Sequence, residues 1–183
     1  DQPLKVASLA GIVLDDEQAV LTGTWKRSIS SKSYIGSGYQ HDSNQGKGDK
    51  TALFQTPVGL DGEYEVRFSF TAGSNRTKTL PVTVSHAAGK TTLIIDQTIV
   101  PPINNRLISL GRFSFKASER ARVLVETTAT TGHAIIDAVQ FLTVAEADEQ
   151  AQIAKGVRDE KRTAAELKEL KSQLEKLTTQ QPQ

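Results

Sequence analysis

Cysteine and methionine are both absent from the 183-residue sequence, and tryptophan occurs once. Without cysteine the chain can form no disulfide, thiolate metal site, cysteine nucleophile or thioether-bound haem. No apolar run approaches the roughly 20 residues that cross a bilayer as a helix, so no membrane span is expected. Because the chain begins at Asp1 and has no methionine, we expect a fragment or a processed product.

An excess of charge of either sign is also missing. The chain has 22 basic and 21 acidic residues, for a net charge of +1. Domains that bind nucleic acid usually carry a basic surplus on one face, so no nucleic-acid partner is expected. Its hydrophobic content of 37% supports one modest core, and its length suits one domain plus an appendage.

Catalytic motifs are lacking as well. Gly36-Ser37-Gly38 does not have the spacing of a serine nucleophile elbow. Asp15 and Asp16 are adjacent, and neighbouring residues of a strand point to opposite faces, so they are not expected to act as a pair. The three histidines lie on separate segments without metal-ligand spacing: His41, His86 and His133. We therefore expect no catalytic residues, and no enzyme.

No metal-binding motif is recognised either. The acidic residues of the expected loops do not form a calcium loop of known spacing: Asp15, Asp16, Asp42 and Asp49. A structural calcium ion is compatible with a sandwich of the kind described below but has no support in the sequence. No other cofactor is expected in this chain.

Short runs of valine, isoleucine, phenylalanine and threonine, separated by Gly, Pro, Asn and Asp clusters, dominate the chain from Ile12 to Val144. Within 62–72, Tyr64, Val66 and Phe68 alternate with charged residues, as expected for antiparallel strands with one face on a core. The expected strands are 12–16, 19–25, 51–56, 62–72, 78–86, 90–96, 107–117, 121–128 and 133–144. This pattern predicts an all-β, antiparallel, jelly-roll-like β-sandwich.

The composition changes at Ala145, where Glu, Lys, Arg, Ala and Leu become dense. Residues 146–177 contain no proline, and four leucines fall on one helical stripe: Leu167, Leu170, Leu174 and Leu177. We predict a charged C-terminal helix that packs on a partner, on its own sandwich or on another copy as a coiled coil. The expected organisation is a lead-in segment (1–10), the sandwich (11–145), and the helix with a frayed end or linker (146–183).

Two residues within the sandwich have two interpretations each. Asp137 interrupts a strongly apolar strand. A structural role, in which its carboxylate hydrogen-bonds a neighbouring loop or backbone amides, is favoured over a catalytic role. Trp25 is either part of the core, which is favoured, or a flat face on which a sugar ring stacks.

The stretch SYIGSGYQHDSNQGKGDKT at 33–51 contains two of the three tyrosines and almost nothing that packs a core. Its amides, carboxylates and aromatic rings suit sugar hydroxyls and a sugar's C–H face. The alternative is a long surface loop rich in turn residues, which the composition alone favours.

An ordered set of motifs resembles the golvesin C-terminal-like domain, also called the xanthan lyase carbohydrate-binding-type domain, over about residues 11–144. The motifs are Val13-Leu14-Asp15-Asp16, Gly23-Thr24-Trp25, Gly38-Tyr39-Gln40-His41-Asp42, Gly46-Lys47-Gly48, Gly62-Glu63-Tyr64-Glu65-Val66, Asn75-Arg76, Leu80-Pro81-Val82-Thr83-Val84, Ser85-His86-Ala87-Ala88-Gly89, Asp96-Gln97, Leu110-Gly111-Arg112-Phe113 and Asp137-Ala138-Val139-Gln140-Phe141.

The resemblance implies a β-sandwich module attached to larger secreted or envelope proteins of bacteria, among them polysaccharide lyases, oxidoreductase-like proteins and large c-type cytochromes. It implies carbohydrate binding by polar residues at loop edges and strand ends, where a core role is not expected: Tyr39, His41, Asp42, Asn75, Arg76, His86 and Gln97. Arg76 and Lys47 could pair with the carboxylate or sulfate of an acidic sugar, and Tyr39 or Trp25 could stack. We expect these groups to converge into one patch; alternatively, they hydrogen-bond one another to hold loops in place.

The function predicted from the sequence is a noncatalytic carbohydrate-binding module of a periplasmic, envelope or secreted bacterial protein. Its expected partners are a polysaccharide or oligosaccharide and the rest of a larger parent protein. The alternative is a structural or assembly module that self-associates or docks through residues 146–177.

Overall fold

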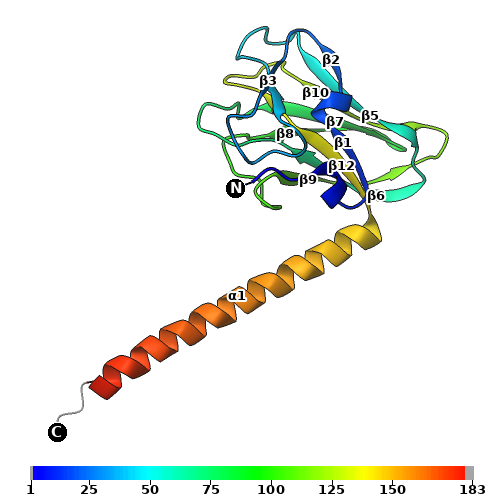
Figure 1. Cartoon of the computed structure of the whole chain (residues 1–183). Helices are drawn as coiled ribbons and strands as arrows, with labels where there is room; N and C mark the ends of the chain where they lie inside the picture. Colours follow the sequence, from blue (N-terminus) through cyan, green and yellow to red (C-terminus); the bar gives the residue numbers. More distant parts are fainter. Residues whose placement is uncertain (1, 180–183) are drawn as a thin grey trace. The chain divides into compact units, whose positions relative to one another are not determined.

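The structure is a computed structural model that describes residues 2–179, with side chains as far as residue 176. The chain divides into two compact units, Asp1–Val144 and Ala145–Gln183. Figure 1 shows the strands of the first unit and the long helix of the second.

The first unit contains two larger sheets and one smaller sheet, all paired in the antiparallel sense. The four-stranded sheet has the order β1 (Ile12–Asp15), β12 (Ala138–Thr143), β6 (Gly62–Ser69), β9 (Leu107–Phe115). The five-stranded sheet has the order β2 (Val20–Thr22), β5 (Thr51–Gly59), β10 (Arg120–Glu126), β7 (Leu80–His86), β8 (Gly89–Ile95). The third has the order β11 (Ile135–Ile136), β4 (Tyr39–His41), β3 (Lys26–Ser28). The predicted antiparallel sandwich is confirmed.

The main core lies between the two larger sheets. The alternating apolar residues of β6 bury Val66 and Phe68 completely, and they meet Val84 and Val123 from the opposite sheet in one cluster. Removing a side chain of this size from water contributes about 1.5–3 kcal/mol to folding. The period of two in the sequence therefore reports the inward face of each sheet.

The outer face of the four-stranded sheet is covered as well. A second apolar cluster joins Leu107 of β9 and Ala138 of β12 to Leu4, Val6 and Leu9 of the N-terminal residues. Ser69 follows Phe68 in β6 and is also fully buried.

The smallest sheet was not predicted. The expected loop at 33–51 contains β4, which pairs with β3 on one side and β11 on the other. The single strand expected at 133–144 is divided at Asp137 into β11 and β12, which belong to different sheets. The segments 26–28 and 39–41 are thereby joined to the distant segment 135–136.

The described part of the second unit is formed by the helix α1 (Val144–Thr179), which has 36 residues and whose first residue belongs to the first unit. At 1.5 Å per residue it is about 54 Å long. Leu167, Leu170 and Leu174 of the predicted stripe are all more than half exposed on it, at 53%, 61% and 62%. The Leu177 side chain and the end at 180–183, expected to be frayed, lie outside what the structure describes. Among residues 2–179, no helix is long and apolar enough to cross a membrane.

Candidate functional site

Two histidines face each other at one end of the sandwich. His41, the last residue of β4, and His133, just before β11, have ring centroids 5.7 Å apart in an edge-on arrangement. The His133 backbone is held from both sides, because its N–H donates to the Asn75 carbonyl (2.9 Å) and its carbonyl accepts from Thr77 N–H (2.9 Å). His133 was not among the predicted site residues, since only this non-local pairing brings it to His41.

Three further polar residues join this pair. Arg76 forms an isolated β-bridge with His133, and its Nη1 donates to Asn75 Oδ1 at 3.0 Å. Lys26 of β3 lies opposite His41 in the register and is exposed. We call this group of Lys26, His41, Asn75, Arg76 and His133 the loop-end surface.

The electrostatics of the loop-end surface are positive. Partial burial lowers the pKa of His41, and the neighbouring His133, Arg76 and Lys26 charges lower it further, whereas the Asp42 carboxylate opposes them. The neutral imidazole is therefore favoured in the free protein, and an anion placed here would favour the protonated form.

Asp42 lies beneath this surface, where it holds several chain segments together. Its carboxylate is fully buried and accepts hydrogen bonds from Asn44 N–H (2.8 Å), Ala134 N–H (3.0 Å) and Lys47 Nζ (2.5 Å). Lys47 also donates to the Gly132 carbonyl at 2.6 Å. Lys47 is therefore engaged inward and joins the 42–50 loop to the segment that carries His133.

Gln97 has a similar role. It is fully buried, and its side-chain amide pairs with both backbone groups of Ile135, at 2.7 and 2.9 Å. The expectation that the polar family residues avoid the core is thus wrong for Asp42 and Gln97. Both are held under the surface by backbone hydrogen bonds that no local sequence pattern specifies.

Tyr39 is a third such correction. Its ring is 1% exposed, and its hydroxyl oxygen lies 3.1 Å from Ser28 Oγ and 2.8 Å from Ser30 Oγ. A ring buried in the main core cannot serve as a surface on which a sugar stacks.

Trp25 is partly buried against the same core, and its Nε1–H donates to the Thr22 carbonyl at 3.1 Å.

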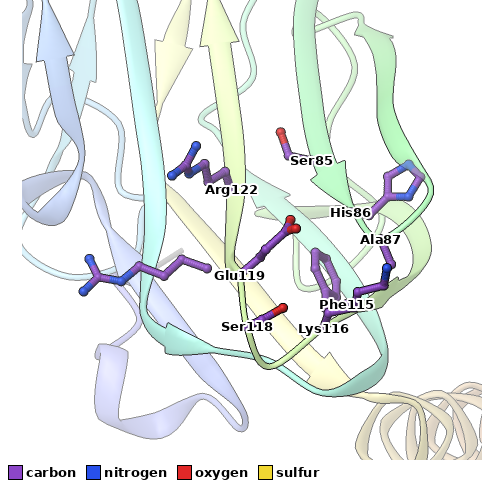
Figure 2. A pocket seen from close by; sticks show the side chains of 9 residues that line it. Ser85, His86, Ala87, Phe115, Lys116, Ser118, Glu119 and Arg122 are labelled. Carbon is purple, nitrogen blue, oxygen red and sulfur yellow. The ribbon is translucent and has the colours of Figure 1, made fainter.

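His86 lies elsewhere, so the prediction of a single patch is wrong for this residue. It ends β7, whereas Arg76 precedes the start of β7; the strand's seven residues separate the two ends by about 20 Å. Its Nε2 lies 2.9 Å from Thr91 Oγ1, and its ring lies 5.0 Å from that of Phe113. His86 borders a hollow of about 380 Å³, shown in Figure 2, lined by Ser85, His86, Ala87, Phe115, Lys116, Ser118, Glu119, Arg120 and Arg122.

Three carboxylates form a separate, buried group, which we call the acidic cluster: Asp15, Asp16 and Asp137. The prediction that Asp15 and Asp16 point apart is wrong, because β1 ends at Asp15 and Asp16 begins the 3-10 turn η2 (Asp16–Gln18). Burial raises the pKa of Asp15 to about 6 and, together with the Asp15 charge, that of Asp16 to about 7. Burial also raises the pKa of Asp137 well above its usual range.

The structural interpretation of Asp137 is confirmed. Its carboxylate accepts hydrogen bonds from Ile35 N–H (3.1 Å) and Ser69 Oγ (2.5 Å), and so fastens the 33–38 segment to the sandwich.

Fold and site together define a β-sandwich domain with a positive loop-end surface and a separate, buried group of carboxylates. The Golvesin C-terminal domain model matches residues 12–143, and the chain belongs to that family. A xanthan lyase from Bacillus sp. (strain GL1) is 31% identical over 142 residues, which make up 74% of this chain and 15% of that protein. This chain therefore spans a small part of that curated relative's length.

The solved structures give a consistent result. A xanthan lyase from Paenibacillus matches 72% of this chain and 13% of its own, with a TM-score of 0.65 and 31% identity. A cycloisomaltooligosaccharide glucanotransferase from Paenibacillus sp., complexed with cycloisomaltoheptaose, matches 72% of this chain and 18% of its own, with a TM-score of 0.52 and 19% identity. The similarity to the glucanotransferase shows only a shared fold. The chain is thus related to domains that are small parts of carbohydrate-active proteins.

Proposed function

We propose that this domain is a noncatalytic carbohydrate-binding module that recognises acidic polysaccharides at the loop-end surface. The observation that carries the proposal is the convergence there of His41, His133, Arg76 and Lys26. Arginine and protonated histidine make charge-assisted hydrogen bonds to carboxylates and sulfates. Asn75, exposed beside them, offers an amide for hydroxyl groups.

A noncatalytic role is supported by the placement of the carboxylates. Glycoside chemistry usually needs two carboxyl groups that both reach the substrate. Asp15, Asp16 and Asp137 are at most 8% exposed, and Asp42 is engaged beneath the surface. The module would act by holding a larger parent protein on its polysaccharide, in a secreted, periplasmic or envelope setting, as the activity of the xanthan lyase relatives suggests.

Affinity electrophoresis and calorimetry with soluble acidic and neutral polysaccharides test this proposal. The chain should be retarded by an acidic polysaccharide such as xanthan, and Arg76→Ala should weaken binding about tenfold by removing one charge-assisted contact. Binding should also tighten as the pH is lowered from neutral, because the pKa of His41 is lowered in the free protein and a bound anion favours the protonated form.

The matched control is Arg120→Ala, an exposed arginine at the hollow beside His86. It should leave the affinity unchanged. Loss of binding in Arg120→Ala but not in Arg76→Ala would move the site to that hollow. Equal binding of acidic and neutral polysaccharides, unaffected by Arg76→Ala, would contradict recognition of acidic groups.

A second candidate function is assembly through α1. Ile153, Val157, Leu167, Leu170 and Leu174 are exposed on this helix, at 44–62% of their full area. An isolated helix with such a stripe gains stability when a partner buries it. In light scattering, a self-associating chain would exceed the monomer mass of 19.8 kDa, and Leu167→Gln with Leu174→Gln should return it to that mass. If the chain without substitutions were monomeric in light scattering, self-association through this stripe would be excluded.

A further inference from the structure

The acidic cluster has the geometry of a cation site. One ligand oxygen from each of Asp15, Asp16 and Asp137 can be chosen so that all three lie within 4.8 Å of one another. Oxygens bound to one calcium ion at 2.3–2.6 Å can lie at most about 5 Å apart. The three carboxylates come from two distant parts of the chain, the end of β1 with the start of η2, and the junction of β11 and β12.

The hydrogen bonding of the cluster is incomplete on one side. Asp16 is 1% exposed, and among the described residues neither of its oxygens accepts a hydrogen bond, although the Gln40 side chain is close enough to favour its charged form. Asp15 Oδ1 is buried without a hydrogen-bond partner within the same part of the chain. Asp137, in contrast, is anchored by Ile35 and Ser69. Buried polar atoms are normally paired, so these free oxygens point to a missing partner.

The Arg27 side chain does not supply that partner. The Arg27 charge acts on Asp15 and Asp16, but the Arg27 side chain is 46% exposed, and its guanidinium donates to the Ser37 carbonyl and lies 4.0 Å from Glu17. Three buried carboxylates repel one another strongly unless a cation or protons compensate them.

The backbone also closes tightly over the cluster. Gly36 lies so close to Asp15 that a Cβ built on it would be 2.2 Å from Oδ2. Glycine at position 36 therefore lets the 33–38 segment approach the Asp15 carboxylate closely.

We propose that Asp15, Asp16 and Asp137 bind a hard divalent cation, with calcium the best match. The donor set consists of carboxylate oxygens, which select hard cations. By joining β1 to the β11–β12 junction, the ion would stabilise the connection between the sheets. This inference is independent of the proposed sugar binding.

The test uses the full chain after treatment with a chelator. Isothermal titration calorimetry with calcium chloride should show one ion bound per chain. At about 100 times the dissociation constant, calcium should raise the unfolding temperature by at least about 5 °C, and magnesium at the same concentration by less.

Asp16→Asn should abolish this shift, and in chelator it should be more stable than the wild type, because it removes one buried like charge. Asp61→Asn, an exposed acidic residue at the β5–β6 turn, is the matched control and should retain the full shift. The wild-type titration decides the outcome even if Asp16→Asn does not fold. No heat and no shift in unfolding temperature with calcium, magnesium or manganese at about 10 mM would overturn the proposal, as would calcium binding that persists in Asp16→Asn.

Discussion

Replacing Asp42 with alanine is expected to lower the free energy of unfolding by about 3–4 kcal/mol. The substitution removes the acceptor of two backbone N–H groups, one of which belongs to the fully buried Ala134. It also leaves the Lys47 ammonium without its carboxylate. Each buried donor without a partner costs about 1–3 kcal/mol, and a charged one costs more. Urea unfolding followed by circular dichroism measures this loss.

Asp49→Ala is the matched control, because Asp49 lies in the same loop and is exposed. Its effect should remain within about 0.5 kcal/mol. In the double variant Asp42→Ala with Lys47→Met, the loss should be smaller than the sum of the two single losses, since no unpaired charge remains. Equal effects of the Asp42 and Asp49 substitutions would show that the network beneath the loop-end surface does not contribute to stability.

Gly132→Ala is expected to cost about 3 kcal/mol, from left-handed backbone strain and overpacking together. Gly132 has φ +85°, and a Cβ there would lie 2.8 Å from the Arg76 carbonyl carbon and oxygen and 3.0 Å from the Asn75 oxygen. All three are backbone atoms, so relief requires movement of the 75–76 turn away from His133. The same urea experiment measures the loss, and the affinity for an acidic polysaccharide should fall with it.

Gly48→Ala separates strain from contact. Gly48 has φ +89°, close to that of Gly132, but a Cβ added to it would meet no atom within 4 Å. This variant should lose about 1–2 kcal/mol from backbone strain alone. If Gly132→Ala lost no more unfolding free energy than Gly48→Ala, the 75–76 turn could move away from the segment that carries His133 at little cost.

The sandwich could be predicted because its information is local. In β6 the alternation of Tyr64, Val66 and Phe68 with charged residues reports directly which side faces the core. Prediction from the sequence failed where a residue's surroundings come from distant segments. Tyr39 has the sequence context of a loop, but pairing of β4 with β3 and β11 places its ring inside.

The candidate sites show the same limit. His41, Asn75 and Arg76 were recognised through family motifs, whereas His133 and Lys26 join them only through the small sheet and one β-bridge. The direction of the Asp16 side chain depends on where β1 ends, and a shift of one residue at a strand end changes the face that a side chain occupies. Alternation along the strand therefore could not reveal the acidic cluster.

Trp25 can serve as an intrinsic fluorescence probe in this chain. It is the sole tryptophan, its indole is partly buried against the core, and it directly precedes Lys26, the residue opposite His41. Indole fluorescence shifts in colour and intensity with the polarity around the ring. Emission excited selectively from tryptophan therefore arises at the core-facing residue just before β3, and α1 contributes none of it. Ligand arrival or loosening of the β3–β4 pairing can thus be followed by emission spectroscopy in the native protein, without a label.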